Sequence, residues 1–375
     1  QYLSFKKALK CGENLKRISY LKKLHQIVEK VQYSNYQKNS ITGIAIFNSK
    51  GCFSKIVKSY CFFNEINGYL KSIGSIPIKD LIYVSAILDK YLLIYEYDET
   101  ITRNKGLLND FLVQYDEKPS NNMHKKFFEN ILNVYDHNLK NIIKSDRPPN
   151  SIFFGERVNS RLINWYKKNQ DFNKKVIFNS YSSQTRASII LEVINYYRQN
   201  RCTECFFSQG DPNTMNISVT PYFFDLETAG FNSILGETAI IIISTLLYDN
   251  YFCPLYHKSS YNYHENVFNQ INRFKPILKW KNIENELYIT CHIKTSQIRK
   301  KYVLKFLEIL KKNNILLTNE IKYYFVMRLL CVFNINKMNQ EDYYYSIFLI
   351  HYFYNLLDEN IYYSLKEKIK SMEEL

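Results

Sequence analysis

The sequence predicts an α+β protein with two lobes, in which a sheet near the amino terminus precedes a mainly helical remainder. Short alternating or apolar runs typical of strands are concentrated in residues 1–100, whereas about the last 140 residues carry almost only helical periodicity. Such segregation of strands and helices along the chain is typical of α+β architecture. The length of 375 residues is enough for two lobes that share a large buried interface.

Residues 1–100 predict a sheet with one inserted helix. The predicted strands cover residues 25–33, 41–48, 52–59, 81–88 and 91–95. Between the third and fourth strands, residues 62–73 place apolar side chains at helical spacing, and an opening helix is expected over residues 2–24. This order describes a five-stranded antiparallel sheet with a helix inserted after the third strand.

Beyond about residue 101 the pattern becomes helical. A breaker, Asp-Arg-Pro-Pro, stands at residues 146–149. Helices are predicted over residues 109–133, 136–145, 158–169, 184–200, 265–274, 296–312, 319–333 and 340–357. The most apolar stretch, residues 238–248, is shorter than the roughly 18–20 apolar residues of a membrane span, so it predicts a buried helix and no membrane partner.

The charge balance bears on the class of partner. Fifty basic residues face 35 acidic ones, which gives a net charge of +15. Lys, Asn, Ile, Tyr and Phe are enriched together, as an AT-rich coding bias produces, and the lysines are dispersed without a basic block. We therefore expect no nucleic-acid partner, although basic residues gathered on one folded face would favour a nucleic-acid-binding protein instead.

The eight cysteines show no framework spacing, and the only C-x-x-C pair is Cys202 and Cys205. A structural zinc site needs about four ligands, and no second ligand pair lies near this one. Lysine and glutamate interrupt the first 30 residues throughout, so no secretory pattern stands there. Free thiols suit a reducing compartment, and a cytoplasmic location is expected.

One segment carries the residue types of a reaction centre. Residues 208–216 (SQGDPNTMN) form the only dense group of polar, turn-forming residues inside apolar surroundings, and they include Asp211 and Asn216. Nine residues after Asn216, a second apolar run ends in Asp225 and Glu227. A hairpin followed by a carboxylate loop brings Asp211, Asn216 and Asp225 to one edge. An aspartate that accepts a hydroxyl proton, with oxygen ligands for Mg²⁺, is what phosphoryl transfer needs.

The same residues resemble a known motif pair. The pattern Gly-Asp-x4-Asn, followed nine residues later by Asp-x-Glu, is similar to that of aminoglycoside phosphotransferases and of choline, ethanolamine and related kinases. Residues 228–239 (TAGFNSILGETA) resemble the Ala-Gly stretch and Asp-x-Ala that follow in this family, with Glu237 where Asp is customary. The resemblance covers residues 184–248 well and residues 41–98 weakly.

This resemblance implies a bilobal protein-kinase-like fold, with residues 1–98 as N-lobe and residues 99–375 as helical C-lobe. It implies transfer of the γ-phosphate of ATP to a hydroxyl of a small metabolite or antibiotic, with Mg²⁺ as the assisting ion. Asp211 corresponds to the catalytic base, Asn216 and Asp225 to the metal ligands, and Glu227 to a residue that assists the metal or the substrate. Neither the acceptor nor the choice between ATP and GTP follows from these residues.

The predicted N-lobe offers residues for the nucleotide. Kinase-type folds place a lysine at the end of the third strand and a glutamate on the next helix. Lys58 ends a predicted strand in this manner and Glu65 follows on a predicted helix, so Lys58 is expected to contact the phosphates, with Lys55 as the rival lysine. Backbone groups around Glu96 and Asp98 are expected to bind adenine, and residues 34–40 form the candidate phosphate loop.

The clearest departure from the family pattern is Gln209, which stands where a histidine is usual. We expect Gln209 to brace the loop by hydrogen bonds, because an amide both donates and accepts. The alternative is a catalytically inactive pseudokinase that binds nucleotide and recruits a partner. Intact Asp211, Asn216 and Asp225 favour the enzyme.

Overall fold

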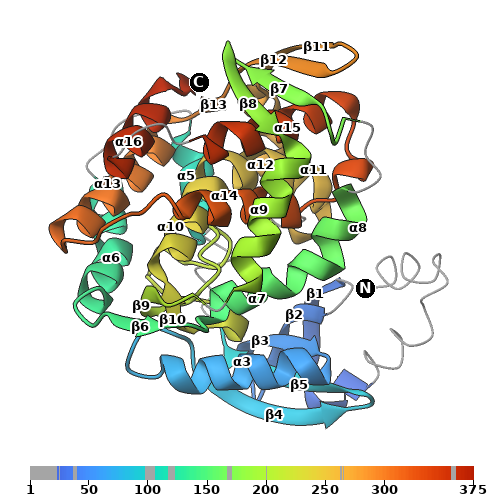
Figure 1. The fold of residues 1–375 in the computed structure, drawn as a ribbon. Helices are drawn as coiled ribbons and strands as arrows, with labels where there is room; N and C mark the ends of the chain where they lie inside the picture. The colour runs from blue at the N-terminus through green and yellow to red at the C-terminus, as the bar shows by residue number, and fades with distance from the viewer. Residues whose placement is uncertain are drawn as a thin grey trace.

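The computed structural model describes residues 23–24, 26–36, 40–97, 106–116, 123–166, 171–199, 201–261, 264, 266–355 and 360–375. Figure 1 shows a sheet and one helix at one end of the molecule, with the other helices filling the rest. The arrangement of the chain is therefore mixed α and β, with most strands of the first part gathered in one sheet.

The first sheet has five strands in the order β1-β2-β3-β5-β4, and all neighbouring strands are antiparallel. The strands are β1 (Lys30–Tyr36), β2 (Ser40–Phe47), β3 (Lys50–Val57), β4 (Leu81–Ile87) and β5 (Lys90–Glu96). Helix α3 (Ser59–Ser72) connects β3 to β4. The strand predicted over residues 25–33 begins only at Lys30, since residues 26–27 are helical, and the helix predicted over residues 2–24 lies almost wholly outside the described residues.

The two faces of this sheet have different partners. Cys52 and Ile56 of β3 pack with Leu92 and Ile94 of β5 on one face. On the other face Val57 belongs to a cluster with side chains of α3, including Phe62, Ile66 and Tyr69. Because side chains alternate along a strand, Phe53, Lys55 and Val57 all point toward α3.

Most of the remaining elements are helical. They are α5 (Leu108–Tyr115), α6 (Met123–Asn138), α7 (Pro149–Arg157), η1 (Val158–Leu162), α8 (Ile163–Tyr166), α9 (Arg186–Arg198), η2 (Leu226–Thr228), α10 (Ile234–Ile243), η3 (Ser244–Phe252), α11 (Cys253–Tyr256), η4 (Lys258–Tyr261), α12 (Asn266–Gln270), η5 (Ile271–Phe274), α13 (Gln297–Lys312), α14 (Ile321–Cys331), η6 (Ile335–Lys337), α15 (Gln340–Tyr354) and α16 (Ile361–Ser371).

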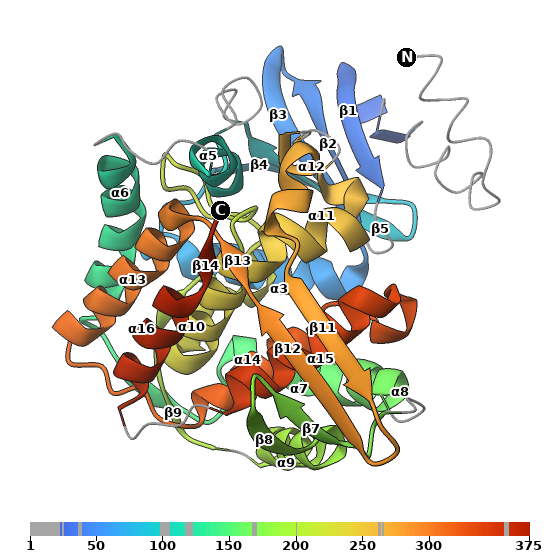
Figure 2. The same cartoon turned by 90° about the horizontal axis from the view of Figure 1, so that it is seen from above.

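Three smaller sheets accompany these helices. One has the order β10-β9-β6, one β11-β12-β7-β8, and one joins β13 to β14. The strands are β6 (Ile143–Ser145), β7 (Lys175–Phe178), β8 (Tyr181–Thr185), β9 (Thr203–Ser208), β10 (Gly230–Ser233), β11 (Ile277–Asn282), β12 (Glu286–His292), β13 (Lys294–Thr295) and β14 (Glu373–Glu374). Figure 2 shows the hairpin of β11 and β12 lying across α15, which both of its strands contact. The sequence did not predict this hairpin.

A long apolar segment forms the centre of the core. Helices α10, η3 and α11 run without a break over Ile234–Tyr256, and α10 packs against α14. In length and composition this segment resembles a membrane span, but 89% of its most apolar window is buried inside the protein. The buried helix predicted over residues 238–248 is therefore present and longer than expected, as a core helix of the folded chain.

Candidate active site

Two loops meet beyond the end of β9. Ile217 and Phe223 pair as an isolated antiparallel bridge, and the N–H of Phe224 donates to the carbonyl of Asn216 over 2.9 Å. Asp225 follows at once, with a left-handed backbone of φ 57° and ψ 66°. The predicted proximity of residues 208–216 to the Asp225 loop is thus built by local backbone pairing.

Gln209 holds these two loops together from a fully buried position. Its Nε2 donates to the carbonyls of Phe224 (2.8 Å) and Asp225 (2.7 Å), and its Oε1 accepts from the N–H of Asp211 over 2.8 Å. Next to it, Gly210 has φ +89°, and a Cβ there would lie 2.4 Å from the carbonyl oxygen of Thr228. The hydrogen bonds predicted for Gln209 are present, and Gly210 permits the turn.

We expect Gln209→Ala to lower the free energy of unfolding by about 1–3 kcal/mol, since buried groups of Phe224, Asp225 and Asp211 lose their partner. Gln209→His should lower the free energy of unfolding less, because an imidazole also donates and accepts hydrogen bonds. Urea unfolding of both variants beside the wild type measures the difference. Equal stability of Gln209→Ala and the wild type would show that the brace contributes nothing.

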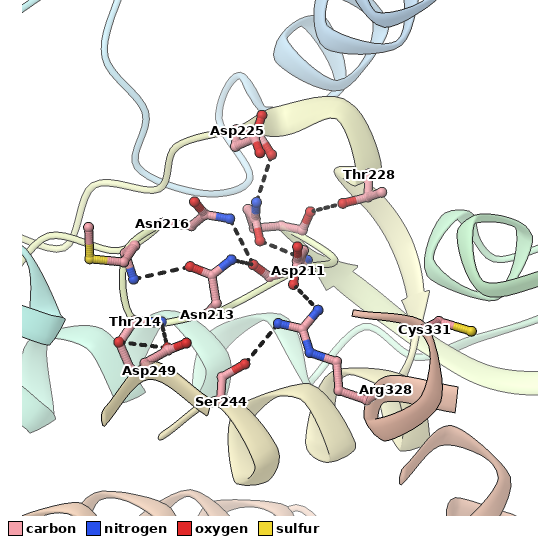
Figure 3. Close-up of polar contacts among 12 residues, drawn as sticks. Asp211, Asn213, Thr214, Asn216, Asp225, Thr228, Ser244, Asp249, Arg328 and Cys331 are labelled. Atoms are coloured by element: carbon pink, nitrogen blue, oxygen red, sulfur yellow. Dashed lines mark hydrogen bonds and ion pairs between the residues drawn. The ribbon is translucent and has the colours of Figure 1, made fainter. Parts of the chain in front are cut away.

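Asp211 faces the cleft and is held by an arginine from the far end of the chain. Arg328 on α14 donates from Nη1 to Asp211 Oδ1 over 2.9 Å and from Nη2 to Ser244 Oγ over 2.9 Å (Figure 3). Burial acts to lower the pKa of Arg328, but the charges of Asp211 and Asp249 outweigh it and raise the pKa. No described residue donates a hydrogen bond to Oδ2 of Asp211, so this oxygen is available to a ligand.

A second buried carboxylate anchors the other end of the Asp211 loop. Thr214 donates to Asp249 Oδ2 from its N–H (2.8 Å) and from its hydroxyl (2.7 Å), and burial raises the pKa of Asp249. Sequence reasoning missed both Asp249 and Arg328. Each is a charged residue within an otherwise apolar helix, and that exception to the pattern is a signal that was available.

The lysine of the site is Lys55, and the prediction that Lys58 pairs with Glu65 is wrong. Lys55 Nζ lies 2.9 Å from Glu65 Oε2 and 2.6 Å from Asp225 Oδ1. Burial acts to lower the pKa of Lys55, but the nearby carboxylates raise it well above its usual value. Lys58 is exposed and immediately precedes α3. The reason is strand alternation: an offset of three residues puts Lys58 out of phase with the α3-facing side chains.

Close packing of α3 on the loop after Asp225 brings Glu65 to this lysine. Gly68 lies against η2 so closely that a Cβ would be 1.7 Å from the carbonyl oxygen of Leu226. Glu65 itself is buried, and Tyr95 donates to its second oxygen over 3.0 Å. Helix α3 and the η2 segment can therefore take up these positions only together.

Three carboxylates in this region lie close enough to share a cation. Oxygens of Glu65, Asp225 and Glu227 are all within 4.8 Å of one another. Burial and the charge of Asp225 raise the pKa of Glu227 to about 7. Asn216 donates from Nδ2 to the carbonyl of Asp211 over 3.0 Å, which leaves its amide oxygen for a ligand. Oxygen donors of this kind suit Mg²⁺.

Except for Glu227, these groups line one cleft of about 580 Å³. Its lining includes Lys55, Asp225, Asp211 and Arg328. Exposed Glu96 also lines the cleft, together with Tyr97, whereas Asp98 lies outside the described residues. Of the candidate phosphate loop, residues 34–36 belong to β1 and residues 37–39 lie outside the described part of the chain.

Glu237 is fully buried in α10 beneath the Asp211 loop. Ser208, the backbone of Gly210 and Tyr135 lie near its carboxylate, but no described residue makes a hydrogen bond of normal geometry to either oxygen. Burial, with a further contribution from the charge of Asp211, raises the pKa of Glu237 to about 8. A glutamate in this position is neutral at pH values well above its ordinary pKa.

The stability of the protein should therefore fall as the pH rises through the range between the ordinary pKa of glutamate and about 8. In this range the unfolded chain has released a proton that the folded chain still holds. Between pH 5 and pH 8 the free energy of unfolding of the wild type should fall by about 3 kcal/mol through this group, and Glu237→Gln should not show this fall. Urea unfolding at both pH values measures it, with exposed Glu308→Gln as control. Parallel pH profiles for wild type and Glu237→Gln would contradict the assignment.

Comparison with known proteins bears on the fold. No protein-family model and no curated protein sequence matches the chain. Several crystal structures of aminoglycoside phosphotransferase APH(4)-Ia are similar, and two of them serve as examples. A thermostable mutant in ternary complex with AMP-PNP and hygromycin B has a TM-score of 0.51 at 9% identity, over 89% of this chain and 97% of that chain. The other structure has a TM-score of 0.48 at 10% identity, over 90% and 98%.

A microcompartment-associated aminopropanol kinase is also similar, with a TM-score of 0.37 at 6% identity over 92% of this chain and 98% of that chain. The fold assignment depends on the ternary complex, whose TM-score is the highest of the three. That likeness extends over nearly the whole of both chains, and it agrees with the motif pair at Asp211–Asn216 and Asp225–Glu227. The chain has the aminoglycoside phosphotransferase fold.

Proposed function

We propose that this protein is an ATP-dependent, Mg²⁺-assisted phosphotransferase that transfers the γ-phosphate to a hydroxyl of a small molecule. One observation carries the proposal. Asp211, with a free carboxylate oxygen, faces the same cleft as a buried lysine that is held by Glu65 and Asp225. Phosphoryl transfer depends on positioning and on neutralisation of charge, and this arrangement provides groups for both.

The nucleotide would lie between two lobes, residues 1–98 and residues 99–375. Apolar side chains that suit a purine line this part of the cleft, namely Ile44, Phe53, Leu107 and Phe223. The backbone from Glu96 onward would bind the adenine edge, as expected for a hinge. Lys55, oriented by Glu65, would contact the phosphates, and the AMP-PNP in the similar ternary complex supports a nucleotide in this fold.

The metal would be held by Asp225 and by the amide oxygen of Asn216, with Glu227 as an assisting carboxylate. When bound, Mg²⁺ neutralises charge on the phosphate oxygens. Asp225 is half exposed toward the cleft, and its present partner Lys55 compensates its charge. The residues therefore fit such an ion in donor type, and oxygens of Asp225 and Glu227 also lie within 4.8 Å of each other.

Asp211 would act as the base. The acceptor hydroxyl donates to Oδ2, the bond from its oxygen to phosphorus forms as the bond from phosphorus to the leaving oxygen breaks, and the proton moves to Asp211. Gln209 fixes the backbone of Asp211, and Arg328 fixes its side chain through Oδ1. Oδ1 of Asp211 therefore holds the side chain in place, and Oδ2 is left to accept the proton.

Saturation with Mg·ATP at about 100 times its Kd should stabilise the protein by roughly 2.7 kcal/mol, which a thermal shift measures. Asp225→Ala should remove the Mg²⁺-dependent part of this shift, because it removes a metal ligand. Exposed Asp146→Ala is the matched control and should keep it. Absence of any Mg²⁺-dependent shift with both ATP and GTP would overturn the proposed function.

A further inference from the structure

The acceptor side of the cleft is lined by arginines. Arg157 stands at the end of α7, Arg161 lies one turn later in η1, and Arg328 comes from α14. Positions four apart on a helix share a face, which places Arg157 and Arg161 together. His257 lines the same part of the cleft. Arg328 contacts Asp211, and the charge of Asp211 also acts on Arg157.

Most of the charged groups in the cleft are already paired. Lys55 is paired with Glu65 and Asp225, and Arg328 is paired with Asp211. Two further carboxylates of the lining region are occupied as well. Asp110 lies 2.6 Å from His264 Nδ1, and Asp249 accepts both hydrogen bonds of Thr214.

Arg157 and Arg161 are the arginines of the cleft that are not paired in this way. The guanidinium of Arg157 stacks on Phe153, with Cζ 3.5 Å from the ring centroid, and Arg161 donates to the carbonyl of Cys331. Within the described residues, no carboxylate forms an ion pair with either of them. Burial and the charge of Arg161 lower the pKa of Arg157 to about 9, and the charge of Asp211 opposes this shift only in part. Among the described residues, neither guanidinium thus has a carboxylate at ion-pair distance, and both line the cleft.

We propose that the acceptor carries an anionic group, a carboxylate or a phosphate monoester, which binds Arg157 and Arg161 while its hydroxyl meets Asp211. This inference rests on the proposed phosphotransferase function and specifies its substrate class. A guanidinium offers a planar pair of donors that fits either anion, and its attraction is strong where water is excluded. A polycationic acceptor such as an aminoglycoside would meet like charges here.

Arg328 and Lys55, the lysine expected to contact the nucleotide phosphates, lie in different parts of the site. Figure 3 shows Asp211 between Asp225, which Lys55 contacts, and Arg328. The carboxylate that Lys55 contacts and the guanidinium of Arg328 therefore lie on opposite sides of Asp211. The charges of Arg161, Arg328 and Asp211 all act on Arg157, so an anion bound at Arg157 would lie near the Arg328 side of Asp211.

Calorimetric titration with inorganic sulfate tests the site directly. Wild type, with and without saturating Mg·AMP-PNP, should bind one sulfate, and Arg157→Gln should weaken this binding roughly 10–100-fold. Arg157 makes no ion pair among the described residues, so this variant should fold. Exposed Arg201→Gln should bind sulfate as the wild type does. Lys55→Met should also bind sulfate in the absence of nucleotide. This result would exclude the phosphate-binding lysine as the sulfate site.

Transfer assays with Mg·ATP and four matched sugars then identify the anion. We expect gluconate or glucose 6-phosphate to be preferred over neutral glucose, and cationic glucosamine to be the poorest; the better of the two anions distinguishes carboxylate from phosphate. The inference is overturned if wild type binds no sulfate, if Arg157→Gln binds it as tightly, if AMP-PNP displaces it, or if glucosamine is preferred. Arginine-dependent sulfate binding without any Mg·ATP binding would instead refute the kinase function and leave the anion site standing.

Discussion

Asp211→Asn is expected to lower the rate of phosphate transfer by about 10²–10⁴ and to leave the affinity for Mg·ATP within about threefold. Asparagine keeps the shape of the side chain and can still accept the hydrogen bond from Arg328, but its amide cannot take the proton of an acceptor hydroxyl. Single-turnover kinetics gives the rate of the chemical step, and calorimetry gives the nucleotide affinity.

A structural defect has to be separated from a chemical one. Asp211→Asn removes the negative charge opposite buried Arg328, so part of any loss could reflect a displaced loop. Arg328→Gln breaks the same ion pair but keeps the base, and it should therefore retain more activity than Asp211→Asn. The roles assigned here are wrong if Asp211→Asn weakens Mg·ATP binding as strongly as Asp225→Ala, or if both variants of the ion pair lose turnover equally.

Lys55→Met is expected to weaken Mg·ATP binding roughly 10–100-fold, whereas Lys58→Met should leave it unchanged. Lys55 is buried and is the only described cation that contacts Glu65 and Asp225 by an ion pair. Its removal leaves Glu65 buried without a countercharge, and the free energy of unfolding should fall by about 3 kcal/mol. Exposed Lys58 should contribute less than about 0.5 kcal/mol.

The two lysines form a matched pair, since they differ by three positions and carry the same charge. Calorimetry with Mg·ATP and urea unfolding of both variants measure the two effects. Loss of nucleotide binding in Lys58→Met, with normal binding in Lys55→Met, would support the prediction from sequence that Lys58 contacts the phosphates. Equal loss in both would indicate a general effect of positive charge near the cleft.

The local chemistry of the site was accessible from the sequence. The polar segment at residues 208–216 and the carboxylates after residue 224 form their turns from nearby residues, and the hydrogen bonds of Gln209 span only 15 and 16 positions. Strands β2 to β5 also lie close to their predicted ranges, because alternation and turn residues are local signals. For these features the physical determinants are contiguous in the chain.

Other features depend on contacts that no local pattern encodes. The hairpin of β11 and β12 was missed although its turn is local, and its pairing with β7 joins segments more than a hundred positions apart. The choice of Lys55 over Lys58 depended on which face of β3 meets α3. An offset of an odd number of residues, such as the three between Lys55 and Lys58, reverses that face, and only the packed sheet fixes which face it is.

The sequence by itself determined the type of reaction centre, through the order and spacing of Asp211, Asn216 and Asp225. The tertiary structure alone decided which charges accompany that centre. Arg328 reaches Asp211 across 117 positions, and Arg157 and Arg161 enter the same cleft from α7 and η1. Electrostatic interactions depend on distance in space and on exclusion of water, and both quantities exist only after the chain has packed.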